Sequence, residues 1–385
     1  MKKTNKISKW TKRPHKTKMQ SDTRRDFIKS SALSIGALLG SSIIETTDAA
    51  TRHVSKPPKG KGEQRLSLEK LKAWEDWRYG MFIHFGLSTF VGKEVPYGYD
   101  SPLEYAPDEL DVDQWIRVAR DSGMRYAVLT AKHCSGHCLW PSKCTDYTVA
   151  NSGNKTDVVL KFIEACKKYN VKPGLYYNCI DTHHKFGSRT LLDLQPSSVS
   201  NTYPKANESL APFTTSMYQS FMTDQLTELL TQYGPTAEIW IDNPGILGSG
   251  YRTYLYHHLS DLQPDAVIMM ANAMDDASDY DVAAAWPSDL IPIKATLPPV
   301  GGHKKWREIN GKTYYMPGEV CLPIGKDWFY VEGDKPRASE ELMKEYLRIK
   351  KSGANFLLDV PPDKHGVIPD QYVKALLDIK RSTGI

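Results

Sequence analysis

The feature that most constrains the fold is a regular alternation of short apolar runs with amphipathic stretches, from residue 64 almost to the end of the chain. The apolar runs are continuous, which is typical of parallel strands that are buried on both faces of a sheet. We expect at least six such strands, at residues 81–85, 126–130, 172–177, 238–242, 266–270 and 354–358.

Between these runs, apolar residues recur at helical spacing, and some stretches begin with a capping residue. Helices are predicted at residues 112–120, 158–169, 214–233, 251–262, 340–351 and 370–380. Strands that alternate with helices predict the α/β class, and the number of units favours one (β/α)₈ barrel over residues 64–385. A doubly wound open sheet is the alternative. No Gly-x-Gly-x-x-Gly or Walker sequence follows a predicted strand, which argues against it.

Two segments interrupt the alternation. Residues 183–212 are rich in Ser, Asn and Thr and form a long insertion after the third predicted strand. Residues 287–318 contain five prolines and a Gly-Gly pair, and are predicted to be a loop. Long loops after barrel strands are where substrate contacts concentrate.

The first 50 residues have the composition of an export signal. They contain eleven Lys and Arg against four acidic residues, and end in small residues at Ala49 and Ala50. Arg24 and Arg25, followed by a short apolar stretch, look like a twin-arginine signal, the route that exports folded proteins. The stretch is shorter than the roughly 20 residues that span a bilayer, which disfavours an uncleaved membrane anchor. We expect cleavage, a linker at residues 51–63 and a periplasmic or secreted protein.

The basic character of the chain belongs to this leader. The whole chain has 50 basic and 45 acidic residues; without the first 50 positions it has 39 and 41, a net charge of −2. The remaining chain therefore does not require nucleic acid or an anionic membrane as a partner. No other stretch is long and apolar enough to span a bilayer, so we expect a soluble mature protein.

Polar and aromatic residues follow four predicted strands in succession. They are His84 after the first, Lys132 and His133 after the second, Tyr177 at the end of the third, and Trp240 with Asp242 in the fourth. The carboxyl ends of barrel strands meet at one rim. Aromatic rings offer flat apolar faces to a sugar, and His and Lys donate hydrogen bonds to hydroxyls. Asp242 alone would suit a structural cap, but at such a rim it can act as a nucleophile.

A metal centre is an alternative interpretation of the second of these segments. His133, Cys134, His137, Cys138 and Cys144 lie close together in the sequence. Their spacing matches no common ligand pattern, and thiolates suit structural zinc better than catalytic zinc. We therefore expect neither a metal nor a cofactor.

Five segments, in this order along the chain, resemble the retaining α-L-fucosidases of glycoside hydrolase family 29. They are residues 77–86, 131–140, 172–178, 238–242 and 353–366. The resemblance implies a barrel that cleaves terminal α-L-fucose from fucosylated glycans by double displacement. It also implies that Asp242 is the nucleophile, and that His84, His133, Tyr177 and Trp240 contact the sugar.

The chain departs from the family pattern at two points. The family usually has a second His and an Asp-Gly-Phe where this chain has Cys134, Ser135, Gly136 and His137. One sugar-binding imidazole is then either missing or supplied by His137. Residues 279–287 contain no glutamate, although many relatives carry the acid/base there. Glu319, which follows a plausible strand at residues 312–315, is then the candidate acid/base, with Asp281 or Asp279 as alternatives. In a retaining enzyme the two carboxyl groups lie about 5–5.5 Å apart.

Three further expectations follow from the same comparison of patterns. The chain ends soon after the predicted barrel, so we expect no appended β-sandwich. A sugar-binding protein without catalytic activity stays open because of the missing glutamate. A glycosidase for another sugar also stays open, because a fold and its motifs do not determine the sugar.

Overall fold

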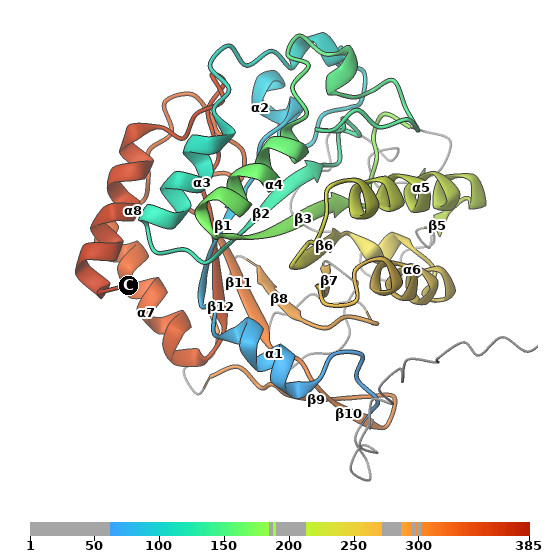
Figure 1. Ribbon diagram of the computed structural model, residues 1–385, viewed down its shortest axis with the longest axis vertical. Coiled ribbons are helices and arrows are strands. Elements are labelled where there is room, and N and C mark those ends of the chain that lie inside the picture. The colour runs from blue at the N-terminus through green and yellow to red at the C-terminus, as the bar shows by residue number, and fades with distance from the viewer. Residues whose placement is uncertain (1–61, 185–187, 190–212, 272–285, 295–296, 299–301) are drawn as a thin grey trace, which may run out of the picture. The chain divides into compact units, whose positions relative to one another are not determined.

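Eight parallel strands form a nearly closed barrel in the computed structural model, which describes residues 62–184, 188–189, 213–271, 286–294, 297–298 and 302–385 (Figure 1). The strand order is β7-β6-β3-β2-β1-β12-β11-β8. Their bounds are β1 Tyr79–Ile83, β2 Tyr126–Lys132, β3 Lys172–Asn178, β6 Glu238–Asp242, β7 Val267–Ala271, β8 Ile291–Lys294, β11 Gly318–Pro323 and β12 Asn355–Asp359.

The gap between β7 and β8 is bridged by the residues just before β8. The backbone N–H of Asp289 donates to the carbonyl of Ile268 at 2.8 Å, and the Asp289 carboxylate accepts from the N–H of Ile268 at 2.8 Å. The hydroxyl of Ser288 accepts from the N–H of Met270 at 3.0 Å. The sheet therefore curls back on itself, and the predicted (β/α)₈ barrel is confirmed over the doubly wound alternative.

Six long helices cover the outside of the barrel (Figure 1). They are α3 Val112–Asp121, α4 Val158–Tyr169, α5 Ser216–Gln232, α6 Ser249–Leu262, α7 Ser339–Ser352 and α8 Asp370–Thr383. Carboxylate caps explain where two of them begin: Asp111 accepts from the N–H of Gln114 at 2.8 Å and Asp157 from that of Leu160 at 2.9 Å. All six predicted helices are present, within a few residues at their ends.

Successive residues of each strand face opposite sides of the barrel wall. In β6, Ile239 and Ile241 pack under the helices, whereas Trp240 packs inside the barrel with Phe82 and Tyr176. Asp242 shares the inward side with Trp240, two positions away along β6. This alternation decides which side chains can meet at the carboxyl rim.

A helix and a hairpin lie at the amino ends of the strands (Figure 1). The helix is α1, Leu68–Glu75, and the hairpin pairs β9, Trp306–Ile309, with β10, Lys312–Tyr315. The hydroxyl of Tyr315 donates to Glu75 at 2.7 Å and so joins the two.

The prediction of a loop at residues 287–318 is wrong, because this segment contains β8 and the hairpin. Pro292 is one of the five prolines that favoured a loop, yet it lies inside β8. It is tolerated because β8 ends the hydrogen-bonded sheet, where a missing N–H leaves no ladder partner unpaired.

Shorter elements complete the described chain. They are α2 at Leu87–Val91, 3₁₀ turns at Pro102–Glu104, Val149–Asn151 and Pro244–Ile246, and the short pair β4 Ser188–Arg189 with β5 Phe213–Thr214. Of the predicted insertion, residues 185–187 and 190–212 lie outside the described residues, as do the predicted signal and nearly all of the linker. No helix within the described ranges is long and apolar enough to cross a membrane.

Candidate active site

Side chains from four neighbouring strands meet at the carboxyl rim of the barrel. We call His84, His133, Tyr176, Trp240 and Asp242 the rim cluster. His84 follows β1 and His133 follows β2, and their ring centroids lie 5.8 Å apart. The His133 ring stacks on Tyr176 of β3 at 5.8 Å, and Tyr176 stacks on Trp240 of β6 at 5.5 Å. The structure thus brings together His84, His133, Trp240 and Asp242 from the sequence-based prediction.

Hydrogen bonds from protein donors fix the carboxylate of Asp242. The hydroxyl of Tyr176 donates to its Oδ2 at 2.6 Å, and the side-chain amide of Asn178 reaches the same oxygen at 3.4 Å. The backbone N–H of Asn243 donates to Oδ1 at 3.0 Å. Burial and the charge of Asp242 raise the pKa of Tyr176 far above its usual value, so the phenol keeps its proton. Asp242 is therefore held in one orientation.

The last barrel strand orients His84. Its Nδ1 lies 2.8 Å from Oδ1 of Asp359, the final residue of β12. Burial raises the pKa of Asp359 well above its usual value, against a lowering effect of the backbone N–H of His84. Trp328 and Phe329, in the loop after β11, both place a ring centroid 5.3 Å from that of His84. These contacts add an aromatic wall to the rim cluster.

Tyr177, predicted to contact the sugar, faces the other side of the barrel wall. Its hydroxyl donates to Gln225 of α5 at 2.7 Å, and its ring packs with the residues under the helices. The inward tyrosine is its neighbour Tyr176. The prediction chose the wrong one of two adjacent tyrosines, because the side-chain direction alternates along β3.

Lys132 was predicted to bind the substrate, but it lies fully buried in an ion pair with Asp181 at 2.9 Å. A register shift in β2 between Thr130 and Lys132 coincides with this placement, and the ammonium lies 4.4 Å from the centre of the Tyr177 ring. Burial acts to raise the pKa of Asp181, but Lys132 and His184 together hold it below its usual value. Lys132 therefore joins the ends of β2 and β3, outside the rim cluster.

His137 does not replace a sugar-binding imidazole in the rim cluster. Its Nε2 lies 2.8 Å from the hydroxyl of Ser152, and its ring packs against Tyr105 and Tyr147. Burial lowers the pKa of His137 to about 3, so the ring is neutral. Its surroundings are those of a structural histidine in the layer behind the rim.

Glu319 lies within a strand, although the sequence suggested that it follows one. It is the second residue of β11, fully buried, whereas Asp242 is the last residue of β6. The predicted strand at residues 312–315 exists, but it belongs to the hairpin outside the barrel. Glu319 therefore lies in the amino-terminal part of the interior and away from the rim. Asp281 and Asp279 lie outside the described residues.

Sequence reasoning did not consider a further carboxylate, Glu94, in the loop after α2. Its backbone carbonyl accepts from the thiol of Cys134 at 3.6 Å, and that sulfur lies 3.2 Å from Nδ1 of His133. Burial raises the pKa of Cys134 well above its usual value, and the charges of Glu94 and Asp242 raise it further. Glu94 is exposed and near the rim cluster.

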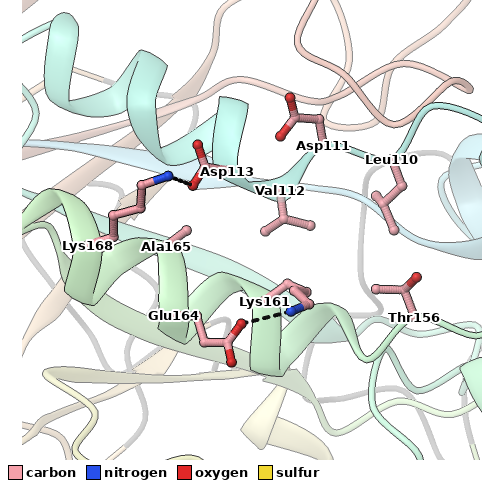
Figure 2. Close-up of a pocket in the computed structure, with 9 residues that line it drawn as sticks. All are labelled: Leu110, Asp111, Val112, Asp113, Thr156, Lys161, Glu164, Ala165 and Lys168. Atoms are coloured by element: carbon pink, nitrogen blue, oxygen red, sulfur yellow. Dashed lines mark hydrogen bonds and ion pairs between the residues drawn. The ribbon is translucent and has the colours of Figure 1, made fainter.

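Two other features do not belong to the rim cluster. In the described part of the chain, no group of three or more His, Cys, Asp or Glu side chains is placed to hold a metal ion. Figure 2 shows a hollow of about 500 Å³ lined by α3, α4 and nearby loop residues, in the layer of helices. Four of its charged side chains form ion pairs, Lys168 with Asp113 at 2.6 Å and Lys161 with Glu164 at 2.9 Å.

Comparison with known proteins bears on this arrangement. The sequence pattern of the alpha-L-fucosidase family matches residues 92–382, which is most of the chain. The chain belongs to the alpha-L-fucosidase family. The resemblance seen in the sequence is thereby confirmed, and family members are the appropriate reference for the rim.

Individual members of the alpha-L-fucosidase family agree with this assignment. Alpha-L-fucosidase 1 of Arabidopsis thaliana is 31% identical over 316 residues, which are 79% of this chain and 57% of that protein. Alpha-L-fucosidase of Dictyostelium discoideum is 26% identical and matches 82% of this chain and 70% of that protein. The structure of isoenzyme 1 from Paenibacillus thiaminolyticus superimposes with a TM-score of 0.65 at 25% identity, covering 82% and 76% of the two chains. The chain thus spans little more than half the length of its Arabidopsis relative.

Several rim residues of this family member were missed by sequence reasoning. Tyr176 and Asn178 share the inward side of β3, and alternation along the strand could have identified them. Asp359 ends the last predicted strand and could have been found by the rule that selected Asp242. Trp328 and Phe329 come from a loop, and only the folded chain brings them to His84.

Proposed function

We propose that this protein is an α-L-fucosidase that removes terminal α-linked L-fucose from fucosylated oligosaccharides or glycans. The observation that carries the proposal is the rim cluster. There, an oriented carboxylate, Asp242, lies among stacked aromatic rings and two imidazoles. Rings and imidazoles of this kind suit the apolar faces and hydroxyls of a sugar, and the carboxylate suits its anomeric carbon.

The mechanism that we propose is a double displacement with retention. Asp242 attacks the anomeric carbon while the bond to the leaving oxygen breaks and that oxygen takes a proton from a second carboxyl group. The same group then deprotonates a water molecule, which releases the sugar from Asp242 with its original configuration. Tyr176 and Asn178 hold the carboxylate in the orientation that attack requires.

The second carboxyl group must reach the leaving oxygen on the rim. Glu319 is poorly placed to be the acid/base, because both of its carboxylate oxygens accept hydrogen bonds from protein groups inside the barrel. Asp281 and Glu94 are then the candidates to test. Alanine at the acid/base should slow cleavage of natural glycans far more than that of a 4-nitrophenyl fucoside, because a good leaving group needs little protonation. Azide should restore turnover of the aryl fucoside and give fucosyl azide.

We also propose that the protein is exported in the folded state, directed by Arg24 and Arg25. None of the six cysteines, which all lie in the described ranges, forms a disulfide bond, as expected for a chain that folds in a reducing compartment before export. Replacing both arginines with lysine should retain the protein in the cytoplasm, and cell fractionation would measure this. Unchanged export of the double variant would contradict the proposal.

Release of 4-nitrophenol from its α-L-fucoside tests the activity. Wild type should turn over, Asp242→Asn should lose activity by several orders of magnitude, and proton NMR should detect the α-anomer first. Fucose binding without turnover would instead favour the sugar-binding protein. Turnover confined to another glycoside would change the sugar but not the chemistry.

A further inference from the structure

Two carboxyl groups face each other inside the barrel, in its amino-terminal half. Glu238 is the first residue of β6 and Glu319 the second residue of β11, and both side chains are fully buried. Two buried carboxylates without a cation are costly to maintain. Among the ion pairs between described residues, none includes either group. The mechanism proposed above uses neither of them.

The hydrogen bonds around the two groups are unequal. Glu319 accepts at both oxygens, from the hydroxyl of Tyr126 at 2.6 Å and from Nε1 of Trp240 at 3.0 Å. Glu238 accepts at Oε2 from Nε1 of Trp74 at 3.0 Å. Its other oxygen, Oε1, is buried and has no partner among the described residues if the group is a carboxylate. A proton on that oxygen would give it one, because Glu319 lies within hydrogen-bonding reach.

We propose that Glu238 is protonated and donates through Oε1 to the carboxylate of Glu319, so that the pair holds one proton and one negative charge. The pair would position Trp240, because the indole N–H donates to the charged member. This proposal deepens the proposed function, since Trp240 belongs to the rim cluster. The protonation state of the pair can be tested without any activity.

The electrostatics of the interior support this assignment. Burial, followed by the charge of Glu319, raises the pKa of Glu238 well above its usual value. Burial raises the pKa of Glu319 only to about 7, because Tyr126 and Trp240 donate to it. The other titratable groups that interact with the pair are Tyr126 of β2 and, through Tyr126, Cys321 of β11. Neither supplies a positive charge, so a shared proton is the source of neutralisation that the described residues offer.

Direct contacts connect the pair to the rim. Trp240 donates to Glu319, its ring stacks on Tyr176 at an interplanar angle of 25°, and Tyr176 donates to Asp242. Displacing the indole would therefore disturb the residue that orients the nucleophile. The pair acts as a positioning element for the rim cluster, and does not contact the substrate in this arrangement.

The same isosteric substitution at the two positions provides matched tests. In Glu238→Gln the amide N–H can donate to Glu319 while its carbonyl accepts from Trp74, so every hydrogen bond is kept. We expect the urea midpoint at pH 7 to be unchanged or higher, and kcat/KM to stay within about twofold of wild type. In Glu319→Gln the amide NH₂ must face either the Trp240 indole, which can only donate, or the Tyr126 hydroxyl, which must then stop donating to residue 319 and accept instead. We expect a lower midpoint, altered tryptophan emission and a loss of about tenfold or more in kcat/KM.

Infrared spectroscopy reports the proton itself. With ¹³C label in the glutamate carboxyl groups, which excludes Asp359, wild type should show the carbonyl band of a protonated buried carboxyl at about pH 8.5, where Glu319, with its pKa of about 7, is ionised. Glu238→Gln should lack this band. Its absence from wild type, or its survival in Glu238→Gln, would overturn the proposal, as would equal or reversed effects of the two substitutions on unfolding. If Glu319→Gln does not fold, the spectra of wild type and Glu238→Gln decide alone. An inactive wild type would refute the proposed function and leave the infrared and unfolding tests intact.

Discussion

Tyr176 and Tyr177 are adjacent in β3 but face opposite sides of the barrel wall. We expect only the Tyr176 hydroxyl to contribute to catalysis. Tyr176→Phe keeps the ring that stacks on Trp240 and removes the hydroxyl that donates to Asp242 at 2.6 Å. A hydrogen bond to a charged group contributes about 1.5–3 kcal/mol, which corresponds to a loss of roughly tenfold to a hundredfold in kcat/KM.

Tyr177→Phe is the matched control. It removes a hydroxyl that donates to Gln225 and lies 3.3 Å from Nζ of Lys132. We expect a loss of about 1–3 kcal/mol in the free energy of unfolding, with kcat/KM close to that of wild type. Hydrolysis of the 4-nitrophenyl fucoside and urea unfolding measure both effects on the same preparations. The assignment is refuted if Tyr177→Phe loses more activity than Tyr176→Phe, or if Tyr176→Phe stays within about twofold of wild type.

Further predictions concern the buried charges and His137. Lys132→Met leaves Asp181 without its cation, and we expect a loss of about 3–5 kcal/mol in urea unfolding; a loss below about 1 kcal/mol would mean that the pair is not buried as described. Because the pKa of Asp181 is lowered, its contribution to stability is present at neutral pH and should be lost only as pH falls below the ordinary carboxyl range. The pKa of Glu319 is raised to about 7, so its contribution is present near pH 4 and should be lost as pH rises through 7. Urea midpoints of wild type should thus decline between pH 5 and 8, and Glu319→Gln should flatten this decline. His137→Gln should lower the melting temperature without changing KM, whereas an increase in KM would place it at the substrate.

The sequence predicts most of the barrel, because its signals are local. The run at residues 238–242 is β-branched and apolar, and β6 has these bounds. The helix at residues 158–169 is bounded by Asp157 and by Asn170, which adopts a left-handed conformation, and α4 has these bounds as well. Strand β8 was not predicted because it has only four residues, one of which is Pro292. Strand β11 was not predicted because it begins just after another strand-like run, at residues 312–315.

The errors at the site have a common physical cause. The side chains of Tyr177 and Glu319 are of the types expected at a sugar site. Alternation along β3 determines which side of the barrel wall Tyr177 faces, and strand pairing determines how far along the barrel axis Glu319 lies. The sequence presents two strand-like runs around Glu319, and only pairing with β12 and β8 shows that the second belongs to the barrel. Lys132 follows a register shift that depends on β3. Asp242 was placed at the rim correctly because it ends its strand, a position that needs no knowledge of register.

The central claim is that Asp242 forms a covalent bond with the sugar. A 2-deoxy-2-fluoro-fucosyl fluoride should react with the enzyme to give a long-lived adduct, because the fluorine slows hydrolysis of the glycosyl ester more than its formation. Proteolysis and mass spectrometry then locate the label. We expect one adduct, on Asp242, with loss of activity in proportion to labelling. A label on another carboxylate, or turnover of fucosides to the inverted sugar without any adduct, would contradict it.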